Sequence, residues 1–218
     1  MPSLAAARVA SPSRLNKPAA VEKLWPESTV VCLAGGPSLT AEDVDACRGR
    51  AHVVAVNDAY RLAPWADVLY GSDAAWWRVH QGVPNFQGLK YSIWVSGQRW
   101  PAGVHVLRNA GSDGLEADPH ALRSGRNSGY AAINLAVHLG ARRIVLLGYD
   151  LQLGPDGKTH WFGDHPSSLT RSSPYAHFLA KFQTLPAPLQ ALGIEVVNCS
   201  RRTALKVFPM RPLREVLA

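Results

Sequence analysis

Two histidines and an aspartate lie within six residues of one another, at His160, Asp164 and His165, in a long polar and aromatic stretch. Imidazole titrates near neutral pH, so a histidine here can accept or donate a proton during a reaction. The spacing H-x-x-x-D-H is not a spacing typical of zinc sites, and no cysteine lies near it. The cluster therefore predicts that His165 or His160 is a catalytic acid or base, with Asp164 as a third catalytic candidate, and it favours this role over metal binding.

A second candidate is the run Gly35-Gly36-Pro37-Ser38, which follows an apolar segment and precedes a helical pattern. Glycines let the backbone approach a phosphate closely, and a helix N-terminus offers N–H groups and the positive end of a dipole. The run matches neither G-x-G-x-x-G nor the Walker A pattern. We expect these four residues to bind the phosphate-bearing part of a ligand, although a plain tight turn before a capped helix has the same spacing.

Further polar residues follow other apolar segments. Asn57 can offer a donor and an acceptor to a base or ribose, and Asp73 can hold a ribose hydroxyl or a metal ion. Ser128 and Gly129 open the strongest helical pattern, where Ser128 can cap the helix and touch the same ligand. Asp150 follows the clearest apolar run. We predict that these residues contribute to the ligand site, with turn formation and helix capping as the alternative roles.

The elements that must position these residues alternate along the chain. Apolar runs predict strands, and patterns of apolar residues at helical spacing predict helices. The predicted strands are residues 29–34, 52–56, 67–70, 89–95, 104–107, 143–148 and 194–198, and the predicted helices are 40–47, 127–139 and 174–192, the last interrupted near Pro186 and Pro188. Such alternation implies a single Rossmann-like α/β domain with a mostly parallel sheet flanked by helices. Ligands bind such sheets at the carboxyl ends of the strands.

Charge is concentrated at the two ends of the chain. Residues 1–21 hold three basic residues and no acid, and residues 201–218 hold five basic residues and one acid, so residues 22–200 are neutral within a net charge of +7. Nucleic-acid binding requires a cationic face, which only the ends could supply. We therefore do not favour nucleic acid as a partner. We expect residues 1–20 to be a flexible basic arm and residues 21–218 to form a nucleotide-binding transferase domain.

The three cysteines, at positions 32, 47 and 199, are odd in number and far apart. They fit neither a disulfide framework nor a C-x-x-C metal site, which favours a reducing compartment and a cytoplasmic location. No apolar run reaches the length of about 18 residues that a membrane span needs. We therefore expect no membrane span. The sequence leaves open whether the chain forms a homo-oligomer.

Three blocks of sequence resemble the bacterial lipooligosaccharide sialyltransferases and the related MptE-like family, which includes 6-hydroxymethylpterin diphosphokinases and flagellin-modifying glycosyltransferases. The blocks are VVCLAGGPSL at 30–39, VAVNDAY at 54–60 and NSGYAAINLAVHLGARRIVLLGYD at 127–150. With a histidine-containing loop and the run Asn198-Cys199-Ser200, they span residues 29–200 in the same order.

The resemblance implies a Rossmann-like fold in which Gly35 to Ser38, Asn57 and Ser128-Gly129 surround the nucleotide part of a donor. It implies that a histidine in the loop after the third block, His165 or His160, is the catalytic base. One departure concerns the first block. The sialyltransferases carry Asn-Gly-Pro-Ser where this chain has Gly35-Gly36-Pro37-Ser38, which puts the identity of the donor in doubt.

The leading hypothesis is a glycosyltransferase that uses a nucleotide-activated sugar. The alternative implied by the resemblance is a pyrophosphokinase of the 6-hydroxymethylpterin diphosphokinase type, using ATP and Mg²⁺, with Asp73 and Asp150 as metal candidates. Mg²⁺ enters only under that alternative. A nucleotide-binding protein without catalysis and a nucleic-acid modifier that grips phosphate with its basic ends are two further possibilities.

Overall fold

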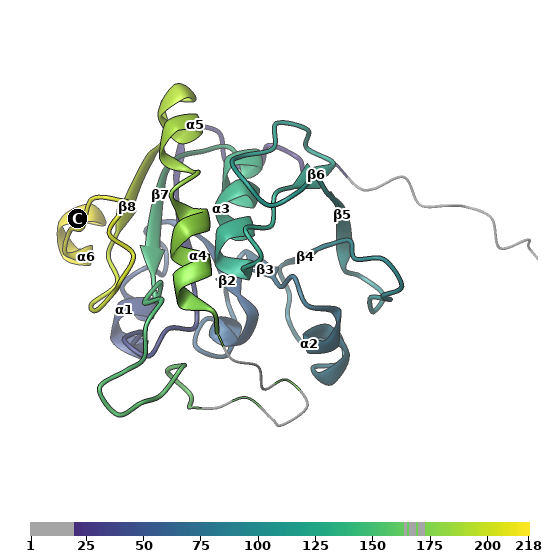
Figure 1. The fold of residues 1–218 in the computed structure, drawn as a ribbon, viewed down its shortest axis with the longest axis horizontal. Helices are drawn as coiled ribbons and strands as arrows, with labels where there is room; N and C mark the ends of the chain where they lie inside the picture. The colour runs from purple at the N-terminus through teal and green to yellow at the C-terminus, as the bar shows by residue number, and fades with distance from the viewer. Residues whose placement is uncertain (1–19, 164, 166–168, 170–172) are drawn as a thin grey trace, which may run out of the picture.

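A computed structural model describes residues 20–163, 165, 169 and 173–218 of the chain (Figure 1). Nearly all of the predicted arm, residues 1–19, and the candidate Asp164 lie outside the described residues. The strands are β1 (Ser28–Leu33), β2 (His52–Val56), β3 (Val68–Tyr70), β4 (Leu89–Ile93), β5 (His105–Asn109), β6 (Ala121–Leu122), β7 (Ala141–Leu147) and β8 (Glu195–Asn198). They form one sheet in the order β6-β5-β4-β3-β2-β1-β7-β8, and all its strand pairs are parallel. The predicted Rossmann-like α/β fold is thereby confirmed.

The direction in which the sheet grows reverses beside β1. Strands β1 to β6 follow one another outward, and β7 then returns to pair with the other side of β1. Cys32 lies opposite Val54 of β2 on one side and opposite Leu146 of β7 on the other. In open parallel sheets the loops diverge at such a reversal, and a crevice forms at the carboxyl ends of the strands.

Helices cover both faces of the sheet. The helices are α1 (Ala41–Asp45), α2 (Ala74–Val79), α3 (Ser128–Leu139), α4 (Tyr175–Phe182), α5 (Pro186–Ala191) and α6 (Leu213–Val216), with a 3-10 helix η1 (Asn57–Arg61). Alternate residues of β1 face opposite sides, since Val30 and Cys32 belong to the core cluster under α3 to α5, and Val31 and Leu33 to the cluster under α1, α2 and α6. Figure 1 shows α3, α4 and α5 together on one side of the sheet.

The helix ends follow from local residue chemistry. Thr40 caps α1 by accepting a hydrogen bond from the Asp43 N–H at 3.2 Å. Gly140 ends α3 with φ of 106°, a left-handed conformation that glycine adopts without strain. The long helix predicted for residues 174–192 is two helices, α4 and α5, and Pro186 stands in the first turn of α5. Four short elements, α2, α6, β6 and the 3-10 helix η1, were not predicted from the sequence.

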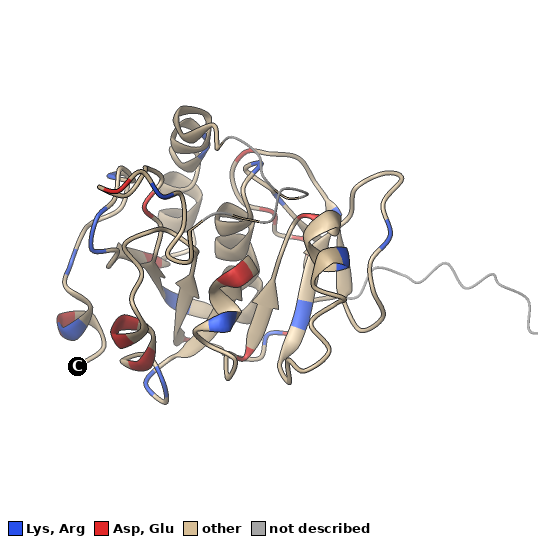
Figure 2. Cartoon of the chain, turned by 90° about the horizontal axis from the view of Figure 1, so that it is seen from below, with Lys and Arg blue, Asp and Glu red and all other residues tan. Residues whose placement is uncertain are grey.

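Basic and acidic residues both occur along many parts of the described chain in the view of Figure 2. The basic C-terminal segment is partly neutralised, because Arg201 pairs with Asp43 at 2.7 Å and with Glu42 at 3.2 Å, and Arg211 lies 4.0 Å from Glu215. No helix among the described residues has the length and apolar character needed to cross a bilayer.

All three cysteines are buried as free thiols. Burial raises the pKa of the Cys32 thiol to about 12 and that of Cys47 to about 12. The thiolate is the reactive form of cysteine, so these side chains act as small apolar residues of the core.

Candidate functional site

A pocket lies where the sheet order reverses, at the carboxyl ends of β1, β2 and β7. The N-terminus of α3, the loop after β7 and the start of α4 complete its walls. The lining includes Gly35, Gly36, Pro37, Asn57, Asp58, Asn127, Ser128, Gly129, Gly148, Asp150, His160, Phe162, His165, Ser173, Tyr175 and Phe178. The pocket thus brings together nine of the twelve residues predicted for the site.

One wall is formed by residues 35–38, which we call the glycine loop. Its two glycines, Gly35 and Gly36, differ in the space available around them. A Cβ on Gly36 would lie 2.4 Å from the Gly148 carbonyl oxygen and 2.5 Å from Asp150 Oδ1, so only glycine fits. The Gly36 N–H donates to the Gly148 carbonyl at 2.9 Å, which ties the loop to the end of β7. A Cβ on Gly35 would meet His160 Nδ1 at an ordinary contact distance of 3.5 Å. Gly36 is therefore required by packing, whereas Gly35 is not.

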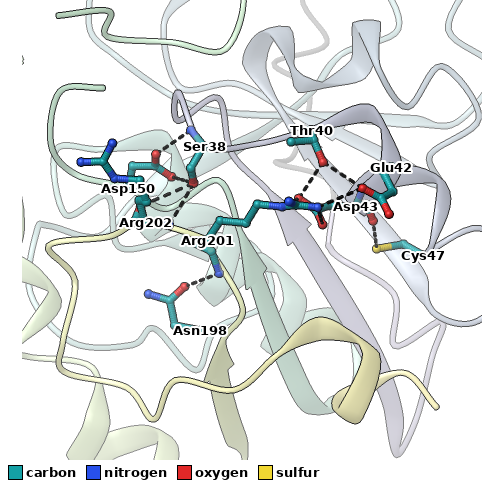
Figure 3. Close-up of polar contacts among 10 residues, drawn as sticks. Ser38, Thr40, Glu42, Asp43, Cys47, Asp150, Asn198, Arg201 and Arg202 are labelled. Atoms are coloured by element: carbon teal, nitrogen blue, oxygen red, sulfur yellow. Dashed lines mark hydrogen bonds and ion pairs between the residues drawn. The ribbon is translucent and has the colours of Figure 1, made fainter. Parts of the chain in front are cut away.

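Asp150 is hydrogen-bonded to Ser38, the last residue of the glycine loop (Figure 3). Its carboxylate accepts hydrogen bonds from the Ser38 N–H at 2.7 Å and from Ser38 Oγ at 2.8 Å. Burial raises the pKa of Asp150, and the hydrogen bonds from Ser38 act in the opposite direction. Ser38, predicted to contact the ligand, does not line the pocket, since its side chain points to Asp150 and the Arg202 backbone. Both side chains thus hold the loop in shape.

The N-terminus of α3 forms a second wall. The structure corrects the prediction that Ser128 caps this helix, because Asn127, with an extended backbone, accepts the hydrogen bond from the Tyr130 N–H at 3.2 Å. Ser128 Oγ accepts a hydrogen bond from the Ser72 N–H at 3.1 Å, which leaves the hydroxyl proton for another acceptor. Backbone N–H groups and this hydroxyl make the helix end suitable for an anion.

Asn57 stands at the end of β2 in a left-handed conformation with φ of 50°. Its side-chain Oδ1 is buried, and no group of the described residues hydrogen-bonds to it. A buried acceptor without a partner costs free energy unless a ligand or water supplies a donor. Oδ1 lies against Gly71, where a Cβ would come within 2.9 Å of it, while the residue itself lines the pocket.

The two histidines stand together in the loop after β7. His160 Nδ1 lies 3.3 Å from the Gly35 carbonyl oxygen, and the His160 ring stacks on Phe162 with centroids 5.0 Å apart. The His165 ring meets His160 edge-on, with centroids 4.5 Å apart. Because a carbonyl oxygen only accepts, Nδ1 of His160 donates in this contact, and Nε2 is then the basic nitrogen of the neutral ring.

Asp58, next to Asn57 after the second predicted strand, was assigned no role from the sequence. Its side chain is 5% exposed, and the residue lines the pocket beside Asn57. The indole Nε1 of Trp76 donates to Oδ2 at 2.8 Å, His80 Nε2 lies 3.3 Å from Oδ1, and His165 Nδ1 lies 3.7 Å from Oδ2. The only signal in the sequence was its position directly after Asn57 at the end of a strand, because its partners are distant in sequence.

Asp73 lies outside the pocket lining. Its carboxylate accepts a hydrogen bond from the Ala75 N–H at 2.8 Å and caps α2, which is the alternative role noted for it from the sequence. Among the described residues, no group of three or more histidine, cysteine, aspartate or glutamate side chains is arranged to hold a metal ion.

The sequence matches no protein-family model and no curated protein. In fold, the chain is similar to the sialyltransferase CstII from Campylobacter jejuni, whose structure was solved in complex with the substrate analogue cytidine-5'-monophosphate. The similarity covers 87% of this chain and 87% of that one, with a TM-score of 0.54 and 11% sequence identity. At this identity the likeness concerns the fold.

Proposed function

We propose that this chain is a glycosyltransferase that moves a sugar from a nucleotide-activated donor to an acceptor hydroxyl. The observation that carries the proposal is the composition of the pocket, which joins an anion-binding backbone to two histidines at the reversal point of the sheet. The similarity in fold to a sialyltransferase solved with a cytidine nucleotide supports the same reading. Affiliation with the MptE-like family stays a prediction, because no family model matches the sequence.

The donor phosphate is assigned to the space between the glycine loop and the N-terminus of α3. Gly35 and Gly36 line this space with backbone alone, and the N–H groups at the start of α3 and the Ser128 hydroxyl can donate to phosphate oxygens. Asn57, which lines the pocket, is assigned to the nucleoside.

The histidines are assigned to proton transfer. The acceptor oxygen attacks the anomeric carbon, the bond from that carbon to the phosphate oxygen breaks, and its electron pair leaves with the nucleotide. The proton of the acceptor hydroxyl passes to a histidine, and His165 is the preferred base because a buried carboxylate faces its ring. His160 lies within ring contact and can orient the acceptor.

Ligand binding is tested by a thermal-shift screen of the full chain with CMP, CDP, UDP, GDP, ADP and ATP, each with Mg²⁺ and with EDTA. A ligand that binds only the folded state raises the unfolding midpoint by mass action. We expect a shift with one pyrimidine nucleotide that persists in EDTA. A shift seen only with ATP and Mg²⁺ would replace the proposal with the pyrophosphokinase alternative, and no shift with any of them would refute the nucleotide pocket.

The chemistry is tested by replacing the histidines. The double variant His160→Gln/His165→Gln is expected to lower transfer by about 10²–10⁴-fold, the usual contribution of a positioned acid or base, with nucleotide binding retained. His105→Gln is the matched control, because His105 is exposed on β5 outside the pocket lining. Transfer at the wild-type rate in the double variant would exclude histidine catalysis.

A further inference from the structure

Asp58 is a buried carboxylate in a crowded, mostly aromatic setting. It is 4% exposed and belongs to η1, directly after β2. Taking a carboxylate out of water is costly, so such a group is retained only where several partners compensate it. The groups that face it are the Trp76 indole and His80 from α2 and its end, Tyr60 and Arg61 from η1, and His165 from the loop after β7.

The partners of Asp58 divide between its two oxygens. Oδ1 faces His80 Nε2 at 3.3 Å and Arg61 at 3.7 Å, and His80 Nδ1 in turn contacts the Trp76 carbonyl oxygen at 2.9 Å. Oδ2 accepts the Trp76 indole N–H at 2.8 Å and faces His165 Nδ1 at 3.7 Å. Trp76 and His80 also stack on each other, with centroids 4.3 Å apart. These contacts from α2 and its end hold the carboxylate in place, with Oδ2 facing His165.

We propose that Asp58 is the positioning residue for His165: it orients the ring with Nδ1 toward the carboxylate and stabilises the imidazolium that forms when Nε2 takes the acceptor proton. This inference rests on the proposed function. The distance of 3.7 Å is an ion-pair distance and exceeds a hydrogen bond, so the carboxylate acts through its charge. The proton taken from the acceptor hydroxyl resides on His165 until product leaves.

Arg61 faces the other oxygen of Asp58, Oδ1, and so affects the interaction between Asp58 and His165. Its guanidinium lies 3.7 Å from Oδ1 of Asp58 and stands over the rings of Trp161 and Phe162, at 5.5 Å and 5.3 Å from their centroids. A cation near the carboxylate partly offsets the negative charge that His165 experiences. Removal of Arg61 and removal of Asp58 therefore have opposite effects on the protonation of His165.

The test follows the His165 ring by NMR titration of the full chain, without ligand and without reference to activity. In Asp58→Asn, which keeps the size of the side chain and an oxygen for Trp76, we expect the proton affinity of His165 to fall about tenfold, which is a shift of its titration midpoint by one pH unit. In Arg61→Gln we expect the midpoint to move to higher pH. An unchanged midpoint in a folded Asp58→Asn would overturn the inference, and if that variant does not fold, a fall or no change in Arg61→Gln would do so.

Kinetics separate this inference from the proposed function. Asp58→Asn is expected to lower kcat about 100-fold with the donor KM unchanged, and to move the acid limb of the pH profile along with the NMR midpoint. If His165→Gln keeps full transfer, the catalytic base has been assigned wrongly, whatever the titration of His165 shows. If His165→Gln is inactive and Asp58→Asn keeps the wild-type kcat and pH profile, the positioning role of Asp58 is refuted and the proposed function stands.

Discussion

The two sides of the pocket are built by different means. On the glycine-loop side, backbone hydrogen bonds and the buried Asp150–Ser38 contact fix the chain, and a Cβ on Gly36 has no room. On the histidine side, the loop after β7 is held to η1 and to Gly35 through ring stacking, cation–π contacts and single hydrogen bonds. The glycine side is therefore part of the folded core, whereas the histidine side depends on the chemistry of individual side chains.

The largest effect on stability is expected from Gly36→Ala. The added Cβ would lie 2.4 Å from a backbone oxygen, which cannot move without displacing the end of β7. Overpacking of this kind costs about 3 kcal/mol, and we expect that loss in the free energy of unfolding measured with urea. Gly35→Ala is the matched control, because its Cβ meets His160 at 3.5 Å, and we expect a change below about 0.5 kcal/mol. Equal losses in the two variants would contradict the contrast between these glycines.

A smaller loss is expected from Asp150→Ala. The change leaves the Ser38 N–H without its acceptor, and an unpaired group of this kind costs about 2 kcal/mol. Ser38→Ala removes only the hydroxyl contact and should cost about 1 kcal/mol. Urea unfolding of both variants at neutral pH measures the two losses. A larger loss of stability in Ser38→Ala than in Asp150→Ala would contradict the conclusion that the Asp150 carboxylate, as acceptor of both hydrogen bonds, holds the loop.

The Asp150→Ala variant also gives a pH dependence of stability with a defined sign. Burial raises the pKa of Asp150 in the folded state above its unfolded value. Protonated Asp150 therefore favours folding below the unfolded pKa, and this contribution is lost as pH rises through the folded pKa. We expect the stability advantage of the wild type over Asp150→Ala to shrink from acid pH toward neutral pH, measured by urea unfolding across that range. An advantage that grows with pH would show that the hydrogen bonds from Ser38 outweigh burial.

The smallest loss of stability, with a clear loss of activity, is expected on the histidine side. Phe162→Ala removes the ring that stacks on His160 and meets His165 edge-on with centroids 5.1 Å apart. Aromatic contacts of this kind contribute about 1 kcal/mol. We expect the free energy of unfolding to fall by no more than this, and transfer to fall at least tenfold because the histidines lose their orientation. Trp94→Ala, at an exposed residue outside the pocket, should change neither quantity.

The sequence predicted the elements that have a clear apolar pattern of their own, which can be recognised without knowing what the element packs against. The runs at residues 29–34, 52–56 and 143–148 correspond to β1, β2 and β7 within two residues, and the pattern at 127–139 corresponds to α3. The elements it missed are short: α2 has six residues, η1 five, α6 four and β6 two. Elements this short are stabilised by packing against the sheet, which no local pattern records.

The same distinction holds at the site. Gly36 and Asn57 were predicted because they follow strands, and the carboxyl ends of parallel strands meet at one edge of the sheet. Asp58 was missed because its role depends on Trp76, His80 and His165, which lie 18 to 107 residues further along the chain. Ser38 and Asp73 were assigned to the ligand, whereas the structure shows them bonded to Asp150 and to the backbone of α2.

Gly35 has room for a Cβ, and this has a consequence for how a protein of this kind changes over evolutionary time. A residue that lines the pocket, and whose Cβ would meet its neighbours only at ordinary contact distances, can be exchanged by a single mutation without loss of the folded state. Its neighbour Gly36 has no such freedom. Position 35 is therefore a place in the pocket wall where a lineage can change the lining while the backbone around Gly36 is inherited unchanged.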